Sequence, residues 1–278
     1  MFQSINYAPP ADLTPFVRQF FVFRAPMPAD FVLVDRLVSE SAMIRVLLEG
    51  DWSAKFGTDS EWRSDGPTLL FGPNARSFGV RVAGSFAVVG VAIRPSGWHA
   101  LFDKRARDIA DGMFSLGDLW GEQADALFAG VSAATDDHEI VGAIETVVRA
   151  RLAAVGTCAS DAAMAIFEDI ARDDSTMRVA DAAERVGLSG SALERRCRAT
   201  FGLTPKVILR RSRFLDMAAA VRGISHPDDE ERAALRFSDQ SHLNREFRHF
   251  IGMTPGQFEK AQTPLLNAVL KLREDGKP

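Results

Sequence analysis

The sequence predicts an α+β protein, with a β-rich N-terminal domain that carries helices at its end and an all-α C-terminal domain. Short segments rich in β-branched and aromatic residues fill residues 16–95, separated by Gly, Pro, Asp and Ser. Helical periodicity begins after Ser96, and the segment at residues 193–205 recurs at residues 243–255. A chain of 278 residues is long enough for two domains with separate cores.

The N-terminal segments are expected to be strands of one barrel or sandwich, because many short strands at close intervals favour these architectures. The expected strands are residues 16–24, 31–38, 42–50, 68–73, 77–84 and 86–95. The apolar spacing then changes to that of helices. The expected helices are residues 98–106, 119–133, 139–153 and 162–172, with a break at residues 156–160.

The repeated segment aligns LERRCRATFGLTP, residues 193–205, with LNREFRHFIGMTP, residues 243–255, without a gap. The identical pairs are Leu193/Leu243, Arg195/Arg245, Arg198/Arg248, Gly202/Gly252, Thr204/Thr254 and Pro205/Pro255, and Ser191 matches Ser241 just upstream. A repeat that keeps arginines as well as apolar residues indicates that one chemical task is performed twice.

Each copy has the signals of a capped amphipathic helix. Apolar residues recur at i, i+4 and i+8, as Leu193, Cys197 and Phe201 and as Leu243, Phe247 and Ile251. The N-caps are expected at Ser189 or Ser191 and at Ser238 or Asp239. Gly202 and Gly252 are expected to end the helices, and Thr204-Pro205 and Thr254-Pro255 to begin the next ones.

A short apolar-striped segment, residues 179–186, precedes the first copy and ends at Gly187. The order helix, glycine turn, helix is that of a helix-turn-helix, whose second helix enters the major groove of DNA. The alternative is a helical bundle in which the arginines only face solvent. Two copies with arginines in the same register favour DNA binding.

These residues resemble a known family. The segment FSDQSHLNREFRHFIGMTPGQF, residues 237–258, is similar to the signature of AraC-type bacterial transcription regulators, and residues 179–205 resemble their first helix-turn-helix. The resemblance implies two helix-turn-helix units joined by a long helix at about residues 205–222, with each recognition helix in one of two adjacent major-groove turns. It places Ser191, Glu194 and Arg195, and Gln240, Ser241 and Arg245, at base-facing positions. The matched Arg198 and Arg248 are also expected to bind DNA, Arg198 through phosphate.

Arg and Gln suit base recognition, because Arg can pair with guanine O6 and N7, and Gln with adenine N6 and N7. The sequence departs from the family pattern before the second unit. Arg236 stands where the family has Gly, and HPDDEERAAL, residues 226–235, replaces a helix with an Ile-Ala pair. The acidic run at residues 228–231 either opposes DNA binding or faces away and stabilises a helix N-terminus, and the second alternative is favoured.

The N-terminal part resembles the family less strongly. Residues 7–24 and 90–102 are similar to the N-terminal region of an AraC-type subgroup, and the broader family tends to have a cupin-like barrel there. The resemblance implies a sensory or dimerising role without indicating a ligand. Trp52, Trp62, Arg81 and Arg94 are candidates for an effector pocket, and the alternative is that they are core aromatics and solvated arginines.

The net charge of −4 is divided unevenly along the chain. Residues 1–175 contain 15 Lys and Arg against 24 Asp and Glu, whereas residues 176–260 contain 15 against 11. The positive charge therefore coincides with the repeated motif, as DNA binding requires.

The sequence has no pattern of an enzyme or of a metal site. His99 and His138 are the only histidines before the repeated motif, and no nucleophile elbow or phosphate loop occurs. We expect no cofactor, no metal and no catalysis, since an attached repair enzyme would need a reactive Cys in a Cys/His-rich domain. Cys158 and Cys197, the lack of a signal peptide and the lack of a membrane span predict a cytoplasmic protein.

The expected domains are residues 1–156, sensory or dimerising; 157–175, a linker helix; 176–262, DNA-binding; and 263–278, a helical tail. Double-stranded DNA is the expected partner, with RNA polymerase, a small-molecule effector and a second copy of the chain as further candidates. A small-molecule effector and a regulating protein partner are both compatible with the sequence. Activation and repression are equally compatible with it.

Overall fold

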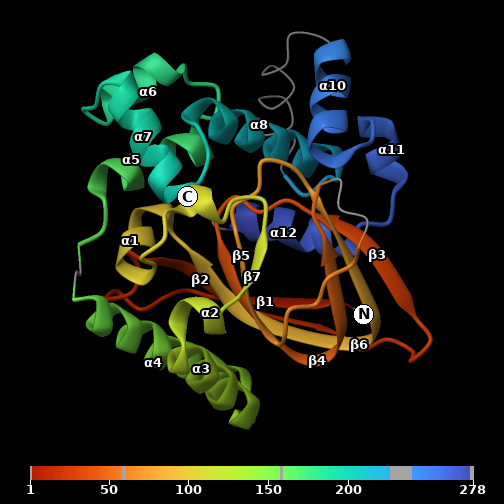
Figure 1. The fold of residues 1–278 in the computed structure, drawn as a ribbon. Helices are drawn as coiled ribbons and strands as arrows, with labels where there is room; N and C mark the ends of the chain where they lie inside the picture. Colours follow the sequence, from red (N-terminus) through yellow and green to blue (C-terminus); the bar gives the residue numbers. More distant parts are fainter. Residues whose placement is uncertain (1, 58–60, 157–158, 226–239, 276–278) are drawn as a thin grey trace.

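The computed structural model describes residues 2–57, 61–156, 159–225 and 240–275. The predicted fold class is confirmed, because a strand-rich N-terminal domain is followed by a helical C-terminal domain (Figure 1). No helix within the described ranges is long and apolar enough to cross a membrane. The acidic run at 228–231, Arg236, Phe237 and the expected caps Ser238 and Asp239 lie outside the described residues.

The strands form one antiparallel sheet in the order β1-β2-β6-β4-β5-β7, and β3 pairs with β6. Their bounds are β1 Gln3–Tyr7, β2 Val17–Ala25, β3 Val32–Leu37, β4 Met43–Lys55, β5 Thr68–Phe71, β6 Phe78–Ile93 and β7 Met113–Ser115. Strands β4 and β6 are long, and β6 pairs with β3 through its first half and with β2 through its second half.

The prediction of two strands at 77–84 and 86–95 is wrong, because both belong to β6. Strand β4 runs beside both halves and bridges the expected break, with register shifts opposite it. Gly50 has a φ of +89°, and a Cβ there would lie 2.3 Å from the carbonyl oxygen of Ser85. The chain therefore bends at this point without leaving the sheet.

The two sheet faces have separate cores. One contains Val22, Ile44, Val46, Val89 and Val91, and is covered by helices that follow the strands. These helices are α1 Trp98–Leu101, α2 Gly117–Trp120, α3 Glu122–Ala133 and α4 Asp137–Val155, with 3-10 turns η1 Pro95–Gly97 and η2 Ala106–Asp108. The expected helix at 98–106 is shorter, because Phe102 is extended. The one expected at 119–133 is split at Gly121, whose φ is +57°.

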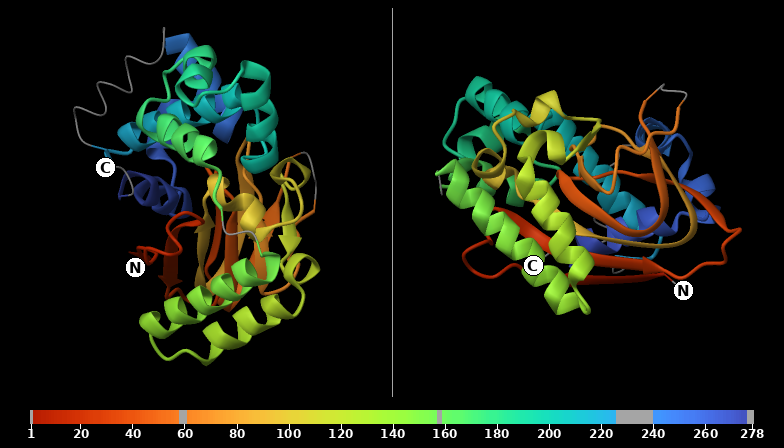
Figure 2. Two further views of the ribbon diagram at one scale, coloured as in Figure 1. Left: turned by 90° about the vertical axis from the view of Figure 1, so that its left-hand side faces the viewer. Right: turned by 60° about the horizontal axis from the view of Figure 1, so that its bottom comes forward.

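The C-terminal helices lie on the opposite side of the sheet from α3 and α4 (Figures 1 and 2). They are α6 Val179–Arg185, α7 Gly190–Thr200, α8 Pro205–Val221, α10 Gln240–Ile251, α11 Pro255–Lys260 and α12 Pro264–Asp275, preceded by α5 Ala162–Asp173. Helix α8 connects two cores: Ile208 and Leu209 pack with α5, α6 and α7, whereas Phe214 and Leu215 pack with α10, α11 and α12.

Helix α12 joins the two domains. Its Leu265 packs into the second sheet core with Phe23, Trp52 and Phe86. Its Leu266 and Leu270 pack into the core that α8 shares with α10 and α11. The expected helical tail is thus an integral part of the fold.

Candidate nucleic-acid interface and its link to the sheet domain

The first helix-turn-helix unit consists of α6, a turn at Gly187 and α7. Gly187 has a φ of +70°, and the hydroxyl of Ser189 caps α7 by accepting a hydrogen bond from the backbone N–H of Ala192 at 3.2 Å. Leu193 and Cys197 are fully buried, as the apolar stripe requires. The expected DNA-binding residues of this helix are all exposed: Ser191, Glu194, Arg195 and Arg198.

The second recognition helix, α10, repeats this arrangement. Phe247 and Ile251 are buried, whereas the matched polar residues Ser241, Arg245 and Arg248 are exposed. Gln240 is the first residue of α10, and its side chain lies outside the described part of the structure. Thr204 and Thr254 cap the next helices through hydrogen bonds from the N–H groups of Val207 and Gln257, both at 3.3 Å.

Helices α8 and α10 are joined by a half-buried ion pair that the sequence does not reveal. The guanidinium of Arg210 donates two hydrogen bonds to the carboxylate of Glu246, at 2.6 and 2.7 Å. Glu246 is buried, although it lies beside the exposed Arg245. This bidentate pair fixes the second recognition helix on the helix that links both units.

The arginines of α7 have different neighbours. Arg198 donates to Glu194 at 2.9 and 3.0 Å, and Arg196 is 3.4 Å from Asp161. Arg195 has no ion-pair partner among the described residues. Its guanidinium would therefore not have to leave a carboxylate in order to bind another group.

Both copies of the repeated segment contact the sheet domain at the glycine that follows the helix, Gly202 after α7 and Gly252 after α10. Gly202 and Gly252 have φ values of +74° and +72°. A Cβ at Gly202 would lie 2.9 Å from the carbonyl oxygen of Ala106, and one at Gly252 would lie 2.8 Å from a guanidinium nitrogen of Arg36. The backbone N–H of Ser77 also donates to the carbonyl of Phe250 at 2.8 Å. The repeated motif therefore meets the sheet domain twice.

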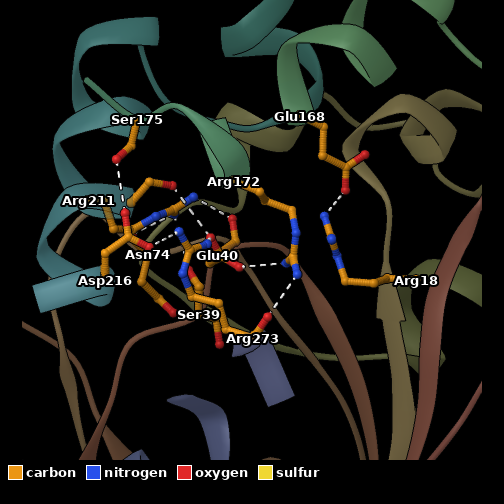
Figure 3. Close-up of polar contacts among 11 residues, drawn as sticks. Arg18, Ser39, Glu40, Asn74, Glu168, Arg172, Ser175, Arg211, Asp216 and Arg273 are labelled. Carbon is orange, nitrogen blue, oxygen red and sulfur yellow. Dashed lines mark hydrogen bonds and ion pairs between the residues drawn. The ribbon is translucent and has the colours of Figure 1, made fainter. Parts of the chain in front are cut away.

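A buried group of charged residues, here called the interdomain cluster, lies between the domains (Figure 3). Glu40, Arg172, Asp216 and Arg273 define it. The carboxylate of Glu40 accepts from Arg172 at 3.1 Å and also from Arg273. Arg273 donates to Asp216 at 2.7 Å. The cluster thereby joins the segment before β4 to α5, α8 and α12.

Arg211 of α8 lies beside this cluster and binds backbone carbonyls. It donates to the carbonyl oxygens of Ser39 at 3.1 Å and Asn74 at 2.9 Å, and also to that of Glu40. Burial lowers the pKa of Arg172, Arg211 and Arg273 to about 10, so all three stay protonated at neutral pH.

The four expected effector-pocket residues do not lie around one cavity. Trp52 is buried in the sheet core, Trp62 and Arg81 are exposed, and Arg94 lies 3.5 Å from Glu168. Trp52 lines a cavity of about 50 Å³ between the sheet and α12. Arg45 also lines this cavity, and sequence reasoning missed it. The available signal was a charged residue in the apolar strand segment AMIRVLLEG.

No group of three or more His, Cys, Asp or Glu side chains within the described ranges could hold a metal ion.

Two family models match separate parts of the chain. Residues 182–261 match the model of a family described as a helix-turn-helix domain. Residues 5–115 match one described as a domain of unknown function, DUF6597. Among curated proteins, none matches the sequence of this chain.

Solved structures give distant similarities. A structure of ToxT from Vibrio cholerae is 12% identical, over 93% of this chain and 97% of that one, with a TM-score of 0.47. Wild-type ToxT from Vibrio cholerae with a bound unsaturated fatty acid is 11% identical, over 86% and 94%, with a TM-score of 0.47. The AraC-like transcriptional activator CuxR is 14% identical, over 76% and 93%, with a TM-score of 0.26.

Proposed function

We propose that this DNA-binding regulator, whose C-terminal domain is a helix-turn-helix domain of the AraC type, reads two adjacent major-groove segments and is controlled through its sheet domain. The observation that carries the proposal is the matched exposure of the two recognition helices. Ser191 and Ser241, Arg195 and Arg245, and Arg198 and Arg248 are all exposed. The apolar stripes beneath them are buried, except that Leu243 is half-buried.

The chemistry of these positions supports sequence-specific reading. An exposed arginine at the same place in each helix can form a bidentate pair with guanine. Arg198 and Arg248 lie one turn further along their helices and suit phosphate contacts, which position a protein without reading sequence. Helix α8 and the Arg210–Glu246 pair hold both helices in one body. A single chain can therefore bind a site that is not a palindrome.

Control through the sheet domain is supported by the contacts at Gly202 and Gly252. A change in the sheet domain would move the ends of both recognition helices, because each glycine packs directly against it. A small-molecule effector and a protein partner could both act in this way. Contacts with RNA polymerase and formation of a homodimer stay predictions.

Footprinting of the full chain on a selected binding site tests the DNA proposal. We expect two protected major-groove segments about 34 Å apart, one helical turn. The Arg195→Ala variant should lose protection in one segment and Arg245→Ala in the other. Arg178→Ala is a suitable control, because this exposed arginine of the first unit is paired with Asp181 and lies off the recognition helix. A single protected segment in the wild type would contradict reading by both units.

A further inference from the structure

We propose that the cavity between the sheet and α12 binds an organic carboxylate with an apolar body, and that Arg45 and Trp52 hold the carboxylate. The inference rests on the proposed control through the sheet domain and names the ligand class and the moving element. In the absence of ligand, α12 closes the cavity. Ligand binding shifts α12. Helix α12 is hydrogen-bonded to α8, which links the two recognition helices.

Arg45 is the first reason for an anionic ligand. Its side chain is 7% exposed, and no carboxylate among the described residues pairs with it. Its Nε has no hydrogen-bond partner in that same part of the chain, and its Nη2 lies 3.9 Å from the sulfur of Met43. The guanidinium lies 4.7 Å from the ring centre of Phe71 and 5.5 Å from that of Trp52. Buried charges are costly unless they are paired.

The other buried arginines show what Arg45 lacks. Arg172 and Arg273 bind Glu40, and Arg211 binds three backbone carbonyls. Burial lowers the pKa of Arg45 to about 10, which leaves it charged at neutral pH. Arg45 is therefore a cation in an apolar core for which the described part of the chain provides no counter-charge.

The walls of the cavity are the second reason. The indole Nε1 of Trp52 is a buried donor with no acceptor within the described residues. Arg45 and Trp52 thus line the same cavity, and each has an unused donor. Apart from Ser4, the remaining wall is apolar: Phe21, Phe23 and Phe86 belong to the sheet, and Leu265 and Val269 belong to α12. Two donors in an apolar cavity match a carboxylate on an apolar body.

The size of the cavity identifies the moving element. About 50 Å³ is far below the roughly 300–1,000 Å³ of small-molecule pockets. A second cavity of about 40 Å³ lies beside the interdomain cluster and shares Met43, Val269 and Leu272 with the first. An outward shift of α12 would join the two cavities. Because Arg273 of α12 binds both Glu40 and Asp216, that shift would be transmitted to α8.

Thermal-shift titrations of the full chain test the ligand class with two matched pairs of probes: naphthalene-2-carboxylate against naphthalene-2-carboxamide, and octanoate against octanamide. Within each pair only the charge changes substantially. We expect at least one carboxylate to raise Tm, and its amide to bind about tenfold or more weakly. The absence of any shift at millimolar concentration, or equal binding of acid and amide, would overturn the inference.

Variants locate the site. Arg45→Met should abolish the preference for the acid, whereas Arg81→Met should keep it, because Arg81 is an exposed arginine of the neighbouring strand. Arg45→Met should also leave the Tm of the unliganded protein unchanged or higher, since it removes an unpaired buried charge. A clear fall in that Tm would show that Arg45 has a structural role instead. Trp52→Phe keeps a ring and removes one donor, so it should weaken acid binding without removing it.

Two further measurements separate this inference from the proposed function. Hydrogen exchange of residues 264–275 should accelerate when the carboxylate binds, and unchanged exchange would overturn the movement of α12. The DNA footprint should also change. Carboxylate binding at Arg45 with an unchanged footprint would contradict the proposed control while leaving the ligand site intact. If the footprint is normal and no carboxylate binds, the proposed ligand site is wrong, whereas the proposed recognition of DNA still holds.

Discussion

Arg195 and Arg198 lie one helical turn apart on α7, yet only Arg198 is engaged in the free protein. Its ion pair with Glu194 joins exposed side chains four residues apart, and such pairs are worth only about 0.3–0.5 kcal/mol. The proposed contact of Arg198 with a DNA phosphate would therefore break this ion pair at little cost. Arg195 needs no such exchange, because it has no ionic partner within the described residues.

Arg195→Ala is expected to cost about 1–3 kcal/mol at the preferred DNA site and to relax base preference locally. Arg198→Ala should weaken binding to all sequences alike and lower the dependence of affinity on salt. Titrations on randomised duplexes at two salt concentrations measure both effects. An unchanged base preference in Arg195→Ala would show that Arg195 does not contact bases.

Asp35 is a buried carboxylate at the N-terminus of α12. It accepts hydrogen bonds from the backbone N–H groups of Leu265 at 2.7 Å and Leu266 at 3.4 Å. Burial raises its pKa to about 6, although these hydrogen bonds act in the opposite direction. Between the unfolded value of 3.8 and about 6 the folded state binds the extra proton. The contribution of Asp35 to stability is thus complete below pH 3.8 and is lost as pH rises through about 6.

Asp35→Asn should remove this pH dependence, because the amide carries no titrating charge. Its oxygen can accept from Leu265 and Leu266, while its NH2 group would face the backbone N–H of Arg36, which lowers the stability of the variant equally at every pH. The difference in unfolding free energy between variant and wild type is expected to change by about 2 kcal/mol between pH 4 and pH 7, in favour of the variant at pH 7. Urea titrations across this range measure it. Parallel curves for the two proteins would show that Asp35 does not titrate here.

At the scale of elements, local signals predicted the recognition helices better than the sheet. The Ser189 and Thr204 caps and the positive φ of Gly202 are properties of a few neighbouring residues, and all three are found as expected. Strands β1 and β7 were not expected, because the short segments QSINY and MFS acquire their identity by pairing with β2 and β5. Nor does the sequence of α12 reveal that it packs on both domains.

Gly187 and Gly202 provide a matched pair for measuring how firmly a helix-turn-helix unit is docked. Both have a φ near +70°, so alanine at either position carries the left-handed backbone cost of about 1–2 kcal/mol. Nothing lies within 4 Å of a Cβ at Gly187, whereas one at Gly202 would meet Ala106 and Pro73 at 2.9 Å. We therefore expect Gly202→Ala to destabilise the protein more than Gly187→Ala in urea titrations. Equal losses of stability in the two variants would mean that the sheet domain can move away from Gly202 at no energetic cost.

The whole molecule is held together by residues far apart in sequence, which no local pattern connects. Glu40 meets Arg172 and Arg273 across 132 and 233 residues. The sequence did indicate that positive charge gathers in the C-terminal part. It could not indicate that several arginines there face the sheet domain and not DNA, because pairing across domains depends on the complete fold.

Glu40→Gln tests this arrangement. The amide can accept one hydrogen bond but leaves Arg172 without its carboxylate and Arg273 with Asp216 alone, so we expect a loss of about 3–5 kcal/mol. Asp65→Asn is the control, because Asp65 pairs with the exposed Arg63 and its loss should hardly change Tm. Hydrogen exchange should accelerate in both α5 and α12. A small loss confined to one helix would show that the cluster does not join the domains. The two protected DNA segments should persist, because α8 and the Arg210–Glu246 pair hold the recognition helices independently of Glu40.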